Sequence, residues 1–130
     1  MGNEHRYDVE KEAAVTREAL ETLEYAYPGR RTRVDIHTDE FTSVCPWSGL
    51  PDFAELHVRY VPRRLLVEMK SLKLYLLQFR NVGILQEHAV NRILEDLVAL
   101  LAPVEMEVEA EFKSRGGLAT RVVVRHGGGG

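Results

Sequence analysis

The sequence contains one cysteine, Cys45, whose surroundings suit nucleophilic chemistry. It begins the segment 45–52, in which two prolines and a glycine predict a loop. Loops held by a rigid sheet often carry reactive groups, although a lone cysteine is more often an inert buried residue. Asp52 ends the segment, where its carboxyl group is either a proton donor to whatever the thiolate attacks or a turn-capping group. A thiol with an acid nearby predicts covalent catalysis.

A second group of polar residues lies in the segment 68–73, near the start of an expected helix. Lys70, Lys73 and Ser71 could bind phosphate there through charge and through the free backbone N–H groups of the helix. The alternative is an ordinary solvated helix face. Glu87, early in a second expected helix, could accept two parallel N–H donors from a guanine-like base, or it could be a common helix N-terminal acid. Both groups therefore have a functional and a structural interpretation.

The elements that must position these residues follow from the hydrophobic pattern. Alternation of polar and apolar residues predicts strands over 33–37, 54–60, 65–68, 104–112 and 120–124. Helical spacing and helix-forming residues predict helices over 71–81 and 85–101, with Gly83 and Pro103 after their ends. A further helix is expected over 8–27, which is charged and lacks Gly and Pro. This order predicts an α+β domain, an antiparallel sheet with two helices on one face.

The strand 104–112 has a distinctive pattern, because its apolar residues alternate with four glutamates. These are Glu105, Glu107, Glu109 and Glu111. Alternation places all four carboxylates on one face of the sheet. That face is therefore expected to meet water or a basic partner.

The composition excludes several classes of protein. A chain of 130 residues with 45 % hydrophobic and 28 % charged residues is expected to form one globular domain. The net charge of −3 argues against direct binding of nucleic acid. No segment has the roughly 18 to 20 apolar residues of a membrane span or a signal-peptide hydrophobic region, so a soluble cytoplasmic protein is expected. One cysteine cannot form an internal disulfide, and the five histidines lack zinc-ligand spacing, so no structural metal is expected.

Five short motifs occur together in this chain and resemble a known family. They are TSVCP at 42–46, GLPDFA at 49–54, EMKSLKLY at 68–75, FRN at 79–81 and FKSRGG at 112–117. In this order and spacing they resemble the 7-cyano-7-deazaguanine reductases, the nitrile reductases of queuosine biosynthesis. The resemblance covers about 33–117. We therefore expect an N-terminal extension over 1–30, a single catalytic domain over 31–126 and a flexible glycine tail over 127–130.

The resemblance implies a tunnelling fold. In this fold each chain provides a small antiparallel sheet with two helices on one face, and several chains close into an oligomeric barrel. The implied active sites lie between subunits, and the short members of the family resemble stacked rings of identical chains. A homo-oligomer that binds a small 7-deazapurine is therefore expected.

The resemblance also implies a mechanism. Cys45 matches the nucleophile that adds to the nitrile carbon to give a covalent thioimide, and Asp52 matches the acid that protonates the nitrogen. Two hydrides from NADPH then convert the nitrile to an aminomethyl group. Physically, a soft thiolate beside an acid lowers the barrier for attack on a weak electrophile.

The remaining site residues are assigned by the same resemblance. Substrate binding is implied for Glu68, Ser71, Gln86 and Glu87, and cofactor binding for Lys70, Lys73, Arg115 and Gly116. The chain departs from the family pattern at Gln86, where a histidine usually precedes the base-binding glutamate. Glutamine still forms hydrogen bonds but cannot change charge near neutral pH.

Two other functions fit part of the same pattern. A related archaeal group resembles an amidinotransferase that adds ammonia to the nitrile of a deazaguanine in tRNA and needs no NADPH. The presence of Lys70, Lys73 and Arg115 favours the reductase over that enzyme. A non-catalytic purine-binding protein on the same fold would keep Glu87 and could lose Cys45, so the retained cysteine argues against it.

Overall fold

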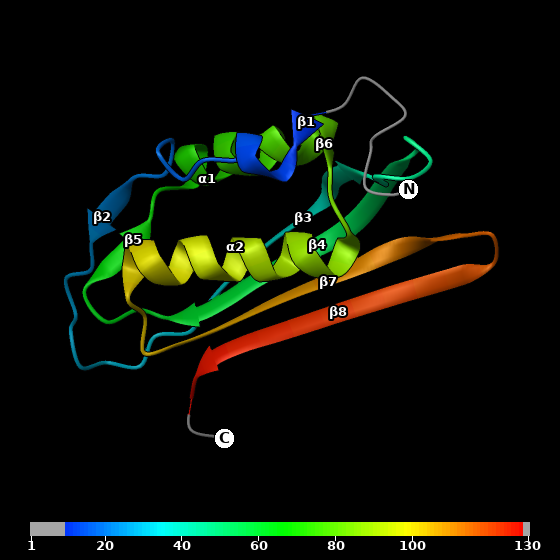
Figure 1. The fold of residues 1–130 in the computed structure, drawn as a ribbon. Coiled ribbons are helices and arrows are strands. Elements are labelled where there is room, and N and C mark those ends of the chain that lie inside the picture. The colour runs from blue at the N-terminus through cyan, green and yellow to red at the C-terminus, as the bar shows by residue number, and fades with distance from the viewer. Residues whose placement is uncertain (1–9, 129–130) are drawn as a thin grey trace.

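The computed structural model describes residues 10–128, which form a twisted sheet covered on one face by two helices (Figure 1). In chain order the elements are β1 (Glu10–Lys11), a 3-10 helix (Glu12–Ala14), β2 (Thr22–Glu24), β3 (Val34–Val44), β4 (Pro51–Val61), β5 (Leu65–Val67), α1 (Met69–Leu77), a second 3-10 helix (Gln78–Asn81), β6 (Val82–Gly83), α2 (Gln86–Leu101), β7 (Glu105–Arg115) and β8 (Leu118–Gly127). The six-stranded sheet has the order β1-β6-β3-β4-β7-β8, and β2 and β5 form a separate pair.

The four long strands β3, β4, β7 and β8 pair antiparallel in this order, as the alternating pattern predicts, with α1 and α2 in the connection from β4 to β7. The inward side chains of β4 and β7, such as Leu56, Val58 and Val108, are almost completely buried. They pack against the apolar face of α2, where Ile93 and Leu97 are fully buried. The expected α+β class and the two helices on one face are therefore confirmed.

The sheet is not purely antiparallel, which corrects one expectation. The two-residue strand β6 lies between β1 and β3 and is parallel to both. Its contact with β3 is short: Val44 is in register with Gly83, and the N–H of Ile84 donates to the carbonyl of Val44 at 3.0 Å. This contact holds the end of β3 beside the chain that leads into α2.

The expected helix over 8–27 is wrong for its described part, residues 10–27. Only Glu12–Ala14 is helical there, as a 3-10 turn. Val15, Leu20 and Tyr25 are buried at intervals of five, which does not give the continuous stripe of a helix. Backbone groups of the segment instead bond to distant elements, since β2 pairs with β5 and the N–H of Thr16 donates to Gln78. Tertiary contacts override the local helix propensity here.

The outer face of the sheet is polar and carries the four glutamates of β7. The pattern predicted that this face meets water or a basic partner, and arginines of the neighbouring strands β4 and β8 are such basic partners within the chain. Arg59 donates to Glu107 and to Glu109 at 2.7 Å each. Arg125 donates to Glu107 at 2.7 Å, so Glu107 and Glu109 are held in a network across the sheet.

The glycine tail begins later than expected. Gly127 ends β8 in register with Glu105, so the prediction of a tail starting at 127 is wrong at that residue. Gly127 has φ of 70°, and a Cβ there would lie 2.5 Å from the carbonyl oxygen of Val104. Residues 1–9 and 129–130 lie outside the described part. Among the described residues, no helix is long and apolar enough to cross a membrane.

Candidate active site

Cys45 lies in the tight loop that joins β3 to β4, and its side chain is partly buried. The loop is closed at both ends by backbone hydrogen bonds. The N–H of Cys45 donates to the carbonyl of Leu50, and the N–H of Gly49 donates to the carbonyl of Cys45, both at 2.9 Å. Gly49 adopts φ of 71°, which lets the chain turn back into β4. The thiol is therefore held by a rigid hairpin, as the Pro and Gly pattern predicted.

The surroundings of the thiol favour its ionised form. Burial alone would raise the pKa of Cys45, but hydrogen bonds hold the pKa below its ordinary value. They involve the side chain and N–H of Ser48, the N–H of Trp47 and the guanidinium of Arg115. Because the thiolate is the nucleophilic form, a lowered pKa makes Cys45 more reactive near neutral pH.

Asp52 is one of the few buried polar residues, and it points to the helix side of the sheet from the start of β4. Its carboxylate accepts a hydrogen bond from Arg115 at 2.7 Å. The same guanidinium donates to the hydroxyl of Ser48 at 3.0 Å. Arg115 thus joins the acid, the serine and the thiol in one cluster, although it comes from the distant end of β7.

The start of α2 lies at the same end of the domain as this cluster (Figure 1). It is brought there by the β3–β6 contact, which places Val44 opposite Gly83. Gln86 and Glu87 form the first turn of α2, and the side chain of Glu87 is exposed. Both residues therefore lie on the segment adjacent to Cys45, and the carboxylate of Glu87 is exposed there.

Glu68 and Ser71 have partners of their own at the start of α1. The two carboxylate oxygens of Glu68 accept from the N–H groups of Ser71 and Lys70 at 2.8 and 3.0 Å, and these bonds hold the pKa of Glu68 below its ordinary value. The Ser71 hydroxyl is buried and accepts from the N–H of Glu21 at 2.9 Å. In this chain both residues act as a helix cap that also anchors the N-terminal segment.

Residues at the start of α1 cannot reach the thiol of their own chain. The helical stretch from Met69 to Asn81 spans roughly 20 Å. The chain then enters β6, which lies beside the β3–β4 loop that carries Cys45. Figure 1 shows the start of α1 at the opposite end of the domain from β6. Of the predicted site residues, the structure brings together Cys45, Asp52 and Arg115. It leaves Glu68, Lys70 and Ser71 at the other end.

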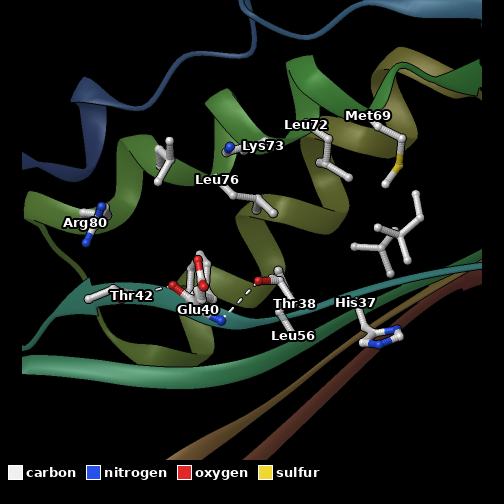
Figure 2. Close-up of a pocket in the computed structure, with 14 residues that line it drawn as sticks. His37, Thr38, Glu40, Thr42, Leu56, Met69, Leu72, Lys73, Leu76 and Arg80 are labelled. Atoms are coloured by element: carbon white, nitrogen blue, oxygen red, sulfur yellow. Dashed lines mark hydrogen bonds between the residues drawn. The ribbon is translucent and has the colours of Figure 1, made fainter.

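Lys73 lines a cavity between α1 and β3 (Figure 2). The cavity has a volume of about 250 Å³. Part of its lining is apolar, with Leu72 and Leu76 from α1 and Leu56 from β4. Arg80 adds a second cation to the lining. Sites for drug-sized ligands usually occupy about 300 to 1,000 Å³. The cavity is too small for a whole dinucleotide, so it could hold only part of one.

Large apolar side chains are exposed around the thiol loop. Trp47, Leu50 and Phe53 are each about half exposed, and Leu118 in the β7–β8 hairpin is 78 % exposed. An exposed apolar surface of this kind is a candidate contact surface for a ligand or another chain.

Two features of the site were not found by sequence reasoning. Ser48 was not singled out, although its hydroxyl contacts the thiol and Arg115. Its position three residues after Cys45, in a segment predicted to turn tightly, could have indicated this role. In the structure Ser48 also accepts a hydrogen bond from the N–H of Leu50 at 3.2 Å. Arg115 was expected at the cofactor, but in this chain it contacts Asp52. Gly116 is exposed in the turn of the β7–β8 hairpin and has φ of 60°.

The fold and this cluster define a class: a small α+β enzyme with a cysteine-centred site. Comparison with known proteins then identifies the family. A family model described as QueF-like protein matches residues 51–129. The NADPH-dependent 7-cyano-7-deazaguanine reductase of Caldanaerobacter subterraneus subsp. tengcongensis is 56 % identical over 95 % of this chain and 92 % of its own length. The enzyme of the same name from Chloroherpeton thalassium is 50 % identical over 84 % of this chain and 94 % of its own length.

A solved structure agrees with this fold. The apo crystal structure of an archaeosine synthase described as QueF-like has a TM-score of 0.70 and 28 % identity. The match covers 76 % of this chain and 97 % of that chain. The chain therefore belongs to the family of NADPH-dependent 7-cyano-7-deazaguanine reductases, as the motifs predicted.

Proposed function

We propose that this protein reduces the nitrile of 7-cyano-7-deazaguanine to an aminomethyl group with NADPH in the cytoplasm, through a covalent thioimide on Cys45. The observation that carries the proposal is the cluster around the thiol. Hydrogen bonds hold the pKa of Cys45 below its ordinary value, and buried Asp52 shares Arg115 with it. A reduced thiolate is what attack on a nitrile carbon requires, and the cytoplasm keeps thiols reduced.

The first step forms the bond between Sγ of Cys45 and the nitrile carbon. One electron pair of the C≡N bond moves to nitrogen. Asp52 takes up the proton that the Cys45 thiol releases and passes it to that nitrogen. The thiol proton therefore ends on nitrogen, so the step is balanced and gives a thioimide. Asp52 is left as a carboxylate, which the guanidinium of Arg115 stabilises at 2.7 Å.

The later steps reduce carbon and release the thiol. Two NADPH molecules, bound in turn, would each supply one hydride, which with two protons would complete the four-electron reduction of the nitrile to the amine. The C–S bond breaks between the two hydride additions, so Cys45 must leave as a thiolate. The hydrogen bonds from Ser48 and Arg115 that lower the pKa of Cys45 also stabilise this leaving group.

Base recognition is assigned to the first turn of α2. A guanine-like edge presents two N–H donors side by side, and the exposed carboxylate of Glu87 can accept both. Gln86 lies beside it and is half-buried, so its amide can donate and accept hydrogen bonds at the same base. The half-exposed side chain of Trp47, in the loop that carries Cys45, would cover one ring face.

The exposed lysines of α1 fit the phosphates of NADPH. Lys70 and Lys73 are one turn apart and exposed, and neither forms an ion pair within residues 10–128. Their charges are therefore free to meet an anion. Since the start of α1 lies at the other end from Cys45, the lysines of one subunit would serve the thiol of another.

An oligomeric ring would bring these two half-sites together. Within the described residues, β8 pairs only with β7, and β3 leaves its outer edge open except at Val44. Such edges carry unpaired backbone groups that pair readily with another strand. Joining the β8 edge of one subunit to the β3 edge of the next closes the sheets into a barrel. The opposite placement of Cys45 and Lys70 supports sites between subunits.

The experiment that tests this function mixes the purified protein with 7-cyano-7-deazaguanine and no NADPH. Intact mass spectrometry should show one base added per chain, and Cys45→Ala should show none. When NADPH is then added, the wild type should oxidise two NADPH molecules per base reduced, and Cys45→Ala should oxidise none. If Cys45→Ala reduced the nitrile, covalent catalysis would be refuted. Native mass spectrometry of the same sample tests the ring, and an active monomer would contradict sites between subunits.

The structural likeness to an archaeosine synthase supports one alternative, amidine formation at the same thiol. That reaction needs the Cys45 adduct and ammonia but no hydride donor. An adduct without NADPH oxidation, together with an ammonia-dependent product on tRNA, would favour it. Identity of 56 % to the reductases against 28 % to the synthase favours reduction.

A further inference from the structure

We propose that Asp35, His37 and His57 form a binding site for a divalent transition-metal ion of the zinc type on the polar face of the sheet. The three residues lie on β3 and β4, far along the strands from the thiol loop. One ligand atom of each lies within 4.8 Å of the others. His37 and His57 are direct cross-strand partners, and their rings stack at 5.3 Å between centroids with an angle of 26°.

The hydrogen bonding of His57 prepares one nitrogen for a metal. Its Nε2 lies 2.9 Å from a carboxylate oxygen of Glu55, which can only accept, so Nε2 carries the proton. In the neutral ring Nδ1 then has a free lone pair. Nδ1 is buried, and no described residue forms a hydrogen bond with it. A carboxylate that orients a histidine in this way is the usual second partner of a metal-binding imidazole.

Asp35 faces this lone pair. Its Oδ1 lies 3.6 Å from Nδ1 of His57, beyond hydrogen-bond distance. In the neutral ring, whose proton is on Nε2, both atoms are acceptors, so a cation between them would relieve the repulsion of their lone pairs. Arg59 contacts only the other oxygen, Oδ2, at 3.3 Å. It is itself held by glutamates of β7, so Oδ1 stays available.

The donor set selects the class of ion. Two imidazoles and one carboxylate suit zinc and its neighbours, whereas magnesium and calcium prefer oxygen ligands. Ligand atoms around tetrahedral zinc lie about 3.4 Å apart, given bonds of about 2.0 to 2.1 Å. The three ligand atoms lie within 4.8 Å of one another, and rotation of the exposed side chains of Asp35 and His37 can bring them to the shorter spacing that zinc requires. Water would take the fourth position.

The test is a zinc titration of the untagged, metal-free full chain, followed by calorimetry. Cys45 is first alkylated with iodoacetamide so that its thiol cannot bind metal. The wild type should bind one Zn²⁺ per chain. Glu55→Ala should weaken binding roughly tenfold to a hundredfold by freeing the His57 ring. His57→Gln and His37→Gln should weaken it further.

Matched controls are His88→Gln and His126→Gln, which alter exposed histidines outside the cluster and should leave zinc affinity unchanged. Circular dichroism checks that each variant folds. Asp35→Asn changes an exposed side chain without changing its size, and it should also weaken zinc binding. Co²⁺ in place of zinc should give the visible spectrum of a nitrogen and oxygen site. The proposal is wrong if the alkylated wild type binds no stoichiometric zinc, or if folded His57→Gln binds it equally well.

Discussion

The guanidinium of Arg115 lies 2.7 Å from the carboxylate of Asp52, although the two residues are 63 positions apart in the chain. The same side chain contacts Ser48 and the Cys45 thiol. One cation therefore touches the acid and the nucleophile of the proposed reaction together. Hydrogen bonds with both groups raise the pKa of Arg115, so it stays charged throughout.

Arg115→Met should lower turnover roughly a hundredfold, because the ionised forms of Cys45 and Asp52 lose a fixed donor. The KM for NADPH should change little if Arg115 acts only within this cluster. Steady-state kinetics with each substrate varied in turn separates the two effects. A raised KM for NADPH with unchanged kcat would instead assign Arg115 to a phosphate of the cofactor, as the family resemblance implied.

Ser48→Ala should raise the pKa of Cys45, because the Ser48 hydroxyl makes the largest lowering contribution. A higher pKa leaves less thiolate at pH 7, so alkylation there should be roughly threefold to tenfold slower, while the rate at high pH is unchanged. The measurement is the rate of reaction with iodoacetamide across pH. Ser114→Ala, at an exposed serine of β7, is the control. Identical pH profiles for Ser48→Ala and wild type would contradict this account of the thiol.

Asp52→Asn keeps the shape of the side chain but removes its acid function. Turnover should fall roughly 10² to 10⁴-fold, the usual contribution of a general acid. Alkylation of Cys45 by iodoacetamide should persist, since that reaction needs no proton donor. Rapid-mixing absorbance of the thioimide should show that formation of the adduct is the slowed step. Normal adduct formation in this variant would exclude Asp52 as the proton donor.

Glu87→Gln should weaken binding of the base about tenfold to a hundredfold, because one acceptor oxygen becomes a donor that faces an N–H group. Calorimetry with 7-cyano-7-deazaguanine measures this in a Cys45→Ala background, where no adduct forms. Glu95→Gln, at an exposed glutamate later in α2, is the matched control. Equal affinity of the Glu87 variant and wild type would reduce Glu87 to a helix N-terminal acid.

Lys70→Ala combined with Lys73→Ala should raise the KM for NADPH by at least roughly tenfold while leaving the Cys45 adduct intact, because charges at phosphate do not touch the nitrile. Lys113→Ala, at another exposed lysine, should have no such effect. Mixing this double variant with Cys45→Ala chains tests sites between subunits. Activity restored in mixed rings would mean that the lysines of one chain serve the thiol of the next, and no restoration would favour a site within one chain.

Local pattern was sufficient for most of the fold. Alternation on β4 and β7 predicts which side chains face the helices, since a strand turns its side chains to opposite faces at every residue. The apolar stripe of α2 predicts its buried face, and Pro103 marks its end. The helix prediction for the segment 10–27 was wrong because the backbone hydrogen bonds of this segment go to β5 and α1, which lie far along the chain.

The sequence alone identified the family, because membership depends on residue types within short motifs. The same motifs predict Cys45 as the nucleophile and Asp52 as the acid. It could not show that Arg115 contacts Asp52, nor that Glu68 caps its own helix with both oxygens. Nor did linear spacing indicate that His37 and His57, twenty positions apart, would stand as cross-strand partners beside Asp35. Such contacts depend on the order of strands in the sheet and on the register of β3 against β4. Both are decided by burial of the whole core, so these sites exist only in the folded chain.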